Sequence, residues 1–169
     1  MPVIGVALSI PEPWATDLQD YRTSIDPSAA LVPTHITLVP PTVLDESQFA
    51  GIQDHLVQVA ETRPTFDVHL RGTGTFRPVS PVVFVSLVEG ISQTEQLAAA
   101  IRSGPLDVAV EFPFHPHVTV AHHLDEPVMD RAFTELSGFD CAFEVVGFHL
   151  YVHDEDEGWR PTREFRLTR

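Results

Sequence analysis

The chain has 169 residues and 43% hydrophobic content, enough for one domain with a substantial core, and no apolar run approaches the ~18 residues of a membrane span. It carries 24 carboxylates against ten arginines, with no lysine, and its net charge is −14. Because proteins that grip long nucleic acids usually present a basic face, this balance argues against extended RNA and favours a mononucleotide or a short oligonucleotide end.

The chain alternates short strand patterns with amphipathic helix patterns from end to end. In the first half of the chain we expect a strand over 3–10, a helix over 13–24, and a strand over 30–39 closed by Pro40 and Pro41. A helix should then run from Asp45 or Ser47 to about Glu61, followed by strands over 66–76 and 82–88. In the second half we expect a helix capped by Ser92 or Thr94 that ends near Ser103, a strand over 108–120, and a helix with Pro127 in its first turn that ends near Gly138. Strands over 141–152 and 163–168 should flank an acidic loop.

Two of these strands carry the same short pattern, a histidine, one residue and a threonine. The copies are His35-Ile36-Thr37 and His117-Val118-Thr119. Side chains alternate along a strand, so each histidine shares a face with its threonine while the intervening residue points the other way. A sheet arrangement that brings both strands together would place two imidazoles and two hydroxyls around one cavity. That set suits acid–base chemistry on a phosphodiester.

With these two motifs in strand settings, the chain resembles the 2H phosphoesterase superfamily, which includes the bacterial 2′-5′ RNA ligase-like proteins and the cyclic nucleotide phosphodiesterases. The resemblance runs from GVALSIPEPW to the closing REFRLTR. It implies a single α+β domain: a bilobed, pseudo-twofold arrangement of two mostly antiparallel sheets, with helices outside and a central active-site groove. The order of predicted elements is itself nearly a repeat, although the two halves show little similarity outside the motifs.

The same resemblance implies a metal-independent phosphoesterase that needs no cofactor and acts on 2′,3′-cyclic phosphates or 2′-5′ phosphodiesters. His35 and His117 would be the acid and the base, and the Thr37 and Thr119 hydroxyls would bond the phosphate oxygens. Resemblance to cyclic phosphodiesterases makes His117 the base and His35 the acid. Pseudo-symmetry leaves this order open, because a reversed substrate would exchange the roles.

Substrate-binding candidates surround these motifs. An aromatic ring could stack a nucleobase, and Phe76 and Phe114 are preferred for this over Tyr151 and Trp159. A phosphate could be reached by side chains in the turn after Phe76 or near the second motif. These candidates are Arg77, Ser80, His115 and His122. Many relatives carry an arginine shortly after the second motif, whereas this chain has His122 or His123 there. That difference weakens the expectation of a guanidinium phosphate clamp at this point.

Two other functions remain open. The protein could hold a nucleotide phosphate without turnover, as a binding module. It could also be a zinc hydrolase that uses His115, His117, His122 and Asp125, although neighbouring side chains on a strand diverge. The single Cys141 excludes an intrachain disulfide, and we expect it to be a small buried residue. We further expect a cytoplasmic monomer with a nucleotide or short RNA end as its partner and without a membrane partner.

Overall fold

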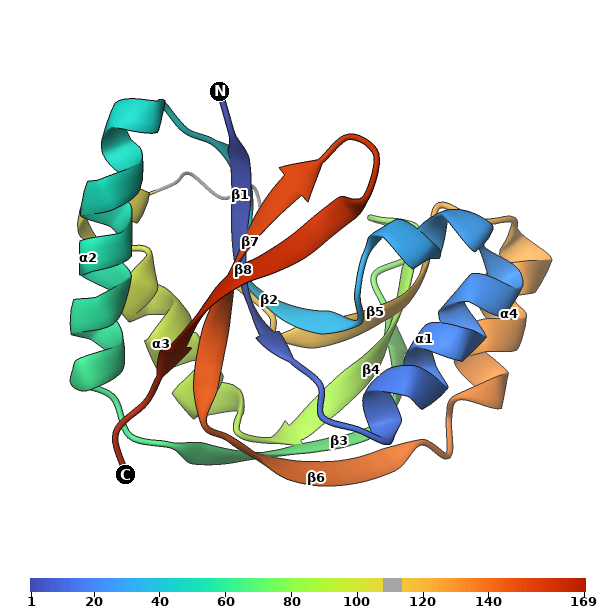
Figure 1. Ribbon diagram of the computed structural model, residues 1–169. Coiled ribbons are helices and arrows are strands. Elements are labelled where there is room, and N and C mark those ends of the chain that lie inside the picture. Colours follow the sequence, from blue (N-terminus) through green and yellow to red (C-terminus); the bar gives the residue numbers. More distant parts are fainter. Residues whose placement is uncertain (108–113) are drawn as a thin grey trace.

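The computed structural model describes residues 1–107 and 114–169, which form eight strands, four α-helices and three short 3-10 turns. The strands are β1 (Val3–Ser9), β2 (His35–Val43), β3 (Phe66–Thr75), β4 (Val82–Glu89), β5 (His117–His122), β6 (Asp140–Val145), β7 (Gly147–Asp154) and β8 (Gly158–Arg166) (Figure 1). The helices are α1 (Trp14–Ile25), α2 (Phe49–Glu61), α3 (Ile91–Ile101) and α4 (Glu126–Glu135), and the 3-10 turns are η1 (Pro27–Leu31), η2 (Glu46–Gln48) and η3 (Gly104–Leu106). No helix among these residues is both long and apolar enough to cross a membrane.

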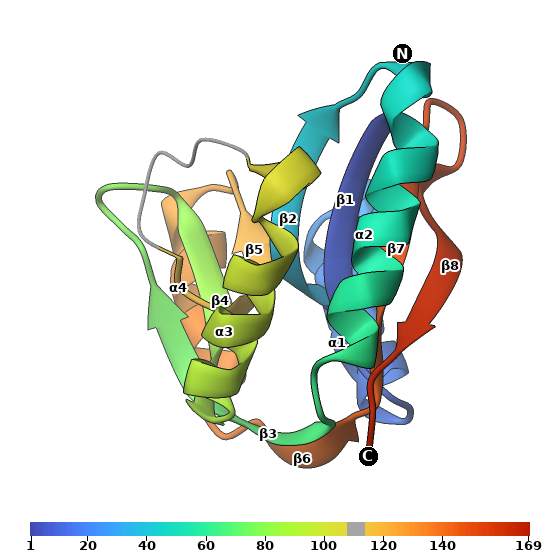
Figure 2. The same cartoon turned by 90° about the vertical axis from the view of Figure 1, so that its left-hand side faces the viewer.

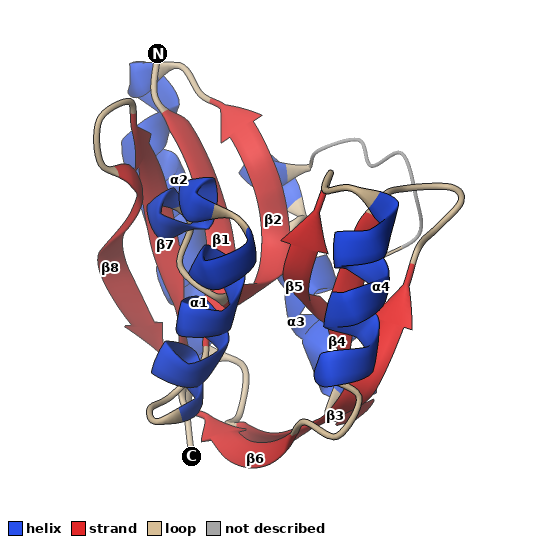
Figure 3. Ribbon diagram, turned by 90° about the vertical axis from the view of Figure 1, so that its right-hand side faces the viewer, coloured by secondary structure: helices blue, strands red, loops and turns tan. Residues whose placement is uncertain are grey.

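The strands form two antiparallel four-stranded sheets, which make the two lobes (Figure 2). The first sheet has the order β2-β1-β7-β8 and the second β5-β4-β3-β6. Helices α2 and α3 lie on one side of the molecule in Figure 2, and α1 and α4 lie on the opposite side in Figure 3. The expected α+β bilobed fold is therefore confirmed. Each motif strand forms an edge of its own sheet, and the two motif strands, β2 and β5, contact one another.

The two faces of each motif strand have the expected opposite roles. Ile36 and Leu38 in the first copy, and Val118 and Val120 in the second, are almost fully buried in the core. The histidines and threonines point the other way and are only half-buried. Burial of the alternate apolar residues fixes the strand register, since a slip of one residue would turn the histidines into the core.

The first motif strand begins and ends later than expected. Residues Pro27–Leu31 form a 3-10 turn, and the strand runs from His35 through Pro40 and Pro41 to Val43. The expectation that the two prolines close this strand is wrong. Proline cannot donate to a sheet ladder, but an edge strand tolerates it because one side of the strand has no partner. For the second motif, residues 108–113 of the expected strand lie outside the described residues. In the described remainder the strand begins at His117, later than expected, and continues to His122, beyond the expected end at Val120.

The expected strand over 141–152 is two strands in different sheets. β6 pairs with β3 in the second sheet, and β7 pairs with β1 and β8 in the first. The chain thus crosses between the lobes at Val146. The final strand also begins earlier than expected, at Gly158. Apolar periodicity along the chain cannot reveal this division, because it does not specify which strand lies alongside.

The expectation that Cys141 is buried is confirmed, and burial raises the pKa of its thiol to about 11.

Helix α3 begins at Ile91 and its N-cap is Gly90, rather than the expected Ser92 or Thr94. Gly90 has a φ of 88°, and a Cβ there would lie 2.5 Å from the Asp67 carbonyl oxygen, so the turn before the helix requires glycine. Thr94 lies inside the helix and its hydroxyl donates to the Gly90 carbonyl. Helix α4 has Pro127 in its first turn, as expected, and ends at Glu135 rather than near Gly138.

Candidate active site

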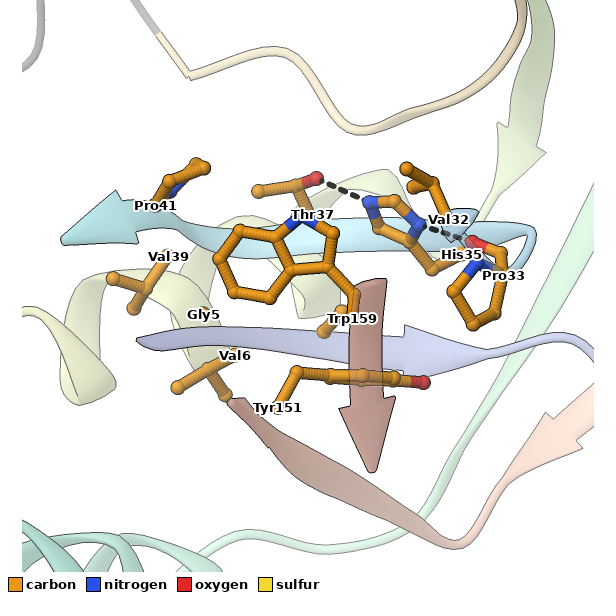
Figure 4. A pocket seen from close by; sticks show the side chains of 11 residues that line it. Gly5, Val6, Val32, Pro33, His35, Thr37, Val39, Pro41, Tyr151 and Trp159 are labelled. Atoms are coloured by element: carbon orange, nitrogen blue, oxygen red, sulfur yellow. Dashed lines mark hydrogen bonds between the residues drawn. The ribbon is translucent and has the colours of Figure 1, made fainter. Parts of the chain in front are cut away.

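The backbone of the first motif fixes the orientation and tautomer of His35. Its Nδ1 lies 2.6 Å from the Pro33 carbonyl oxygen and its Nε2 lies 3.0 Å from the Thr37 hydroxyl (Figure 4). A carbonyl oxygen can only accept, so Nδ1 carries the proton and the neutral ring has its lone pair on Nε2. The Thr37 hydroxyl then donates to that lone pair. Nε2 is therefore the atom of His35 that can exchange a proton with a substrate.

The second motif repeats this arrangement. The Nδ1 of His117 lies 2.6 Å from the carbonyl oxygen of His115, again two residues earlier in the chain. The ring is consequently held in the same tautomer as His35, with Nε2 available. The two copies differ at that atom, since the part of the chain that the structure describes offers Nε2 of His117 no hydrogen-bond partner.

Burial lowers the pKa of both imidazoles from the ordinary value of 6.5. Desolvation is the largest cause for each ring, and the carbonyl bond to Nδ1 opposes it. The Arg22 guanidinium further lowers the pKa of His35, and His115 and His35 further lower that of His117. Both rings are consequently neutral at neutral pH in the free protein, and each presents an Nε2 lone pair.

Both histidines line one cavity of about 380 Å³ between the lobes. One wall comes from α1, η1 and the start of β2, and the other from β5 and the start of β4. Thr119 and His122 also line this larger cavity. The structure therefore brings together His35, His117, Thr119 and His122 from the sequence-predicted set. Thr37 lines a smaller neighbouring cavity of about 160 Å³, which shares His35 and Val32 with the larger one.

The larger cavity also contains a guanidinium that the sequence analysis missed. Arg22 projects from α1, is only 7% exposed, and lines the same cavity as the two histidines. One of its nitrogens, Nη1, donates to Gln19 at 2.7 Å, to the Val32 carbonyl at 2.8 Å and to Thr34 at 3.1 Å. Within the described ranges, Arg22 forms no ion pair with a carboxylate. The Asp26 carboxylate lines the same cavity and acts on Arg22 electrostatically without pairing with it. A buried guanidinium that is held rigidly and has no carboxylate bonded to it is suited to bind a phosphate. No motif in the sequence singled it out.

Aromatic side chains surround His117 more closely than His35. The ring of Phe76 meets His117 edge to face with a centroid separation of 5.0 Å, and the ring of Phe84 lies 5.3 Å from it. His115 packs against the same two phenylalanines. On the other lobe, Tyr151 is the nearest aromatic ring to His35, at 6.4 Å. The structure thus places Phe76 and His115 as packing partners of the second histidine.

The remaining predicted substrate-binding residues have other contacts. The Arg77 guanidinium pairs with Glu126 at 3.0 Å and with Asp130 at 2.8 Å on α4. Phe114 lies under the Arg102 guanidinium, 5.0 Å from its ring centroid, and packs against the core. The Ser80 amide closes the turn onto the Phe76 carbonyl. None of Arg77, Ser80 and Phe114 lines either of the two cavities around His35.

The geometry gives no support to the zinc alternative. Across residues 1–107 and 114–169, no three histidine, cysteine, aspartate or glutamate side chains are grouped in a way that could hold a metal ion. His115 faces Phe76 and Phe84, whereas His122 stacks edge to face on His123. Successive side chains on and around β5 therefore diverge instead of forming a ligand set.

Comparison with known proteins agrees with this fold. Residues 10–157 match the family model described as the 2′-5′ RNA ligase superfamily. A Bacillus licheniformis protein named "putative phosphoesterase" is 30% identical over 149 residues, covering 87% of this chain and 88% of that protein. A Bacillus cytotoxicus protein of the same description is 32% identical over 148 residues, covering 86% of each.

Solved structures show the same bilobed architecture. Escherichia coli LigT complexed with 3′-AMP superposes with a TM-score of 0.75 at 21% identity, covering 100% of both chains. A Thermus thermophilus protein superposes with a TM-score of 0.72 at 22% identity, covering 99% of this chain and 98% of the other. Two antiparallel sheets with a histidine motif on each facing edge define the architecture of a 2H phosphoesterase. This chain belongs to the 2′-5′ RNA ligase superfamily of those proteins.

Proposed function

We propose that this protein is a metal-independent phosphoesterase that uses two histidines as acid and base. It opens 2′,3′-cyclic phosphates or cleaves 2′-5′ phosphodiesters of nucleotides or short RNA ends. The observation that carries the proposal is the larger cavity, where two imidazoles with the same tautomer converge with the Arg22 guanidinium. Such a site can hold one phosphate and serve two proton transfers on opposite sides of it.

Hydrolysis requires one neutral imidazole and one protonated imidazole. The neutral ring takes a proton at Nε2 from the attacking water, while the protonated ring gives its Nε2 proton to the departing ribose oxygen. The new P–O bond forms from the water oxygen as the bond to the ribose oxygen breaks. Proton exchange with solvent then restores the starting state. In the ligase direction, a ribose hydroxyl replaces water as the nucleophile.

The lowered pKa values mean that substrate must help to protonate the acid. Both rings are neutral in the free site, but the negative phosphate favours an imidazolium beside it. Arg22 and the Thr119 hydroxyl then stabilise the charge that builds on the phosphate oxygens. Thr37 bonds Nε2 of His35 in the free protein, so it also orients that ring.

Nucleotides are the favoured substrates on two grounds. E. coli LigT, which shares the fold, has been crystallised with 3′-AMP, NADP+ and ATP. The net charge of −14 opposes the binding of a long polyanion but permits a single phosphate at a local guanidinium. A mononucleotide or a short end satisfies both conditions.

A substrate panel with product NMR tests this proposal. The panel contains the four nucleoside 2′,3′-cyclic phosphates, 2′-5′ dinucleotides and ADP-ribose 1″,2″-cyclic phosphate, each assayed with and without EDTA. We expect turnover of at least one member, and the rate should persist in EDTA. Loss of activity in EDTA with recovery on adding zinc would contradict the metal-independent mechanism. A protein that binds these nucleotides but turns over none would be a binding module.

A further inference from the structure

The two lobes differ at the residue opposite each motif threonine. In the second lobe Phe84 pairs with Thr119, and in the first lobe Ala7 pairs with Thr37. Register makes these positions equivalent, because Ser9 and Ser86 pair with the two motif histidines. A phenyl ring thus stands beside the second motif where the first has only a methyl group.

The second lobe uses this ring to fill the groove face of its sheet. Phe84 lies directly over Gly74, where a Cβ would come within 2.6 Å of the ring, and Phe76 packs on it with a centroid separation of 4.5 Å. Both rings also contact His117. The space over β4 opposite Thr119 is therefore occupied by the protein itself, and within the described residues His117 borders open space only on the side of the larger cavity. The cavity further along that lobe, lined in part by Phe84 and His115, does not include His117 or Thr119.

The first lobe leaves the corresponding face open. The smaller cavity, of about 160 Å³, extends across all four strands of the first sheet, from His35 and Thr37 on β2 through Gly5 and Ala7 on β1 to Tyr151 on β7 and Trp159 on β8 (Figure 4). A Cβ at Gly5 would meet the Trp159 indole at 3.6 Å. Because Gly5 has no side chain, the Trp159 indole packs directly over this part of β1. Ala7, the other small residue on this face, leaves the cavity open beside Trp159, Tyr151 and the motif histidine His35.

We propose that this smaller cavity binds the nucleobase of the substrate, and that the base binds on the His35 side only. The inference rests on the proposed function and names the recognition element of the same site. His35 and Val32 line both cavities, so a nucleoside seated in the smaller one places its ribose phosphate in the larger one. An apolar cavity of ~150 Å³ accommodates a benzene ring, so this one is large enough for the six-membered ring that every nucleobase contains.

Recognition by stacking has a consequence for base preference. The wall is formed mainly by glycine, alanine, valine and proline together with the Tyr151 and Trp159 rings, and the Thr37 hydroxyl is already bonded to His35. Every base has a π face, so binding by stacking tolerates different bases. All four nucleosides should therefore be accepted with modest differences.

Binding of the nucleobase beside His35 also gives the two histidines different roles in the reaction. In a 2′,3′-cyclic phosphate the leaving oxygen belongs to the same ribose that carries the base, so it lies on the His35 side. Water must attack in line from the opposite side, where His117 lies. His117 Nε2 then receives the water proton, and His35 donates its Nε2 proton to the ribose oxygen as the P–O bond breaks. The asymmetry of the cavities thus removes the ambiguity that the two equal motifs leave.

A ratio of specificity constants tests the base site. We compare kcat/KM for a nucleoside 2′,3′-cyclic phosphate with kcat/KM for the 2′,3′-cyclic phosphate of 1-O-methylribose, which lacks a base. Stacking of one base contributes roughly 1–3 kcal/mol, so Trp159→Ala should lower the ratio about 10- to 100-fold. Ala7→Val, which fills the cavity without removing an aromatic ring, should lower it too. Phe133→Ala, on the exposed face of α4, should leave it at the wild-type value.

A sulfur substitution tests the orientation. In a cyclic phosphate whose leaving ribose oxygen is replaced by sulfur, the thiolate departs without a proton. His35→Ala should therefore recover most of its lost kcat on this substrate, and His117→Ala should not. Rescue of His117→Ala instead, or an unchanged Trp159→Ala ratio, would overturn the inference while leaving the two-histidine mechanism intact. A wild-type protein inert on every cyclic phosphate would instead contradict the proposed function itself.

Discussion

The two lobes share the His-x-Thr motif but surround it differently. Each histidine is held by the carbonyl two residues earlier, and each contributes Nε2 to the larger cavity. Around His117 the lobe is packed with Phe76 and Phe84, whereas His35 has Arg22 on one side and an open aromatic cavity on the other. Under the proposed function, the symmetric features would provide the proton chemistry, while the asymmetric ones would position the substrate.

Removing either histidine tests the shared part of the comparison and has the largest expected effect. His35→Ala and His117→Ala should each lower kcat on an oxygen substrate by roughly 10²–10⁴-fold, because a positioned acid or base is lost. Steady-state assays measure this. His69→Ala provides the control, since His69 pairs with Asp140 between β3 and β6.

The double variant sharpens the result. Acid and base act as a unit, so combining the substitutions should cost much less than the product of the single effects. Near-normal rates in both single variants would show that these residues are not the acid and the base.

Arg22 tests the first asymmetric feature. Arg22→Gln should weaken binding of inorganic phosphate by about 10- to 100-fold, since a hydrogen bond to a charged group contributes roughly 1.5–3 kcal/mol. Arg22→Lys should rescue this only partly, because a lysine has a single nitrogen and cannot bond Val32 and Thr34 with one nitrogen while turning others toward the phosphate. Calorimetric titration with phosphate measures both.

Arg77→Gln is the matched comparison for this experiment. Arg77 is already paired with Glu126 and Asp130, so its removal should leave phosphate affinity unchanged. Equal losses in the Arg22 and Arg77 variants would mean that phosphate responds to general charge rather than to the cavity guanidinium.

The pH profile tests whether the two histidines titrate as their surroundings imply. The pKa of each ring is lowered in the free protein, so the bell of kcat/KM should be centred below the ordinary imidazole value of about 6.5. At pH values above the maximum of this curve, kcat/KM should fall about tenfold per pH unit as the general acid loses its proton. Bound phosphate raises the pKa of the acid, so the alkaline limb of kcat should lie at higher pH than that of kcat/KM. Coincident limbs would contradict phosphate-assisted protonation.

Phe76 tests the packed side of the comparison and has the smallest expected effect. Phe76→Leu loses the edge-to-face contact with His117, which suggests a decrease in kcat of about 2- to 10-fold. Because this change loosens the His117 ring and leaves the proposed nucleobase site intact, kcat should fall equally for nucleoside substrates and for substrates without a nucleobase. A loss confined to nucleoside substrates would instead place the base on the second lobe, beside Phe76.

The motifs and their strand setting could be predicted from local sequence. The alternation around His35 and His117 predicts which face each side chain takes, and burial of Ile36 and Val118 on the opposite face agrees with it. The same local reasoning failed at 141–152, where one apolar run is divided between two sheets. Strand periodicity describes a strand's faces but carries no information about its neighbours.

The sequence by itself determined that two His-x-Thr strands exist and that their histidines avoid the core. Only the tertiary structure decided what lies around them: Arg22 arrives from a helix thirteen residues before His35 with no motif to mark it, and Trp159 arrives from the far edge of the first sheet. The contrast between Ala7 and Phe84 became meaningful only once strand register placed them opposite equivalent threonines. Face alternation is a property of neighbouring residues, whereas a cavity is formed by residues that only folding brings together.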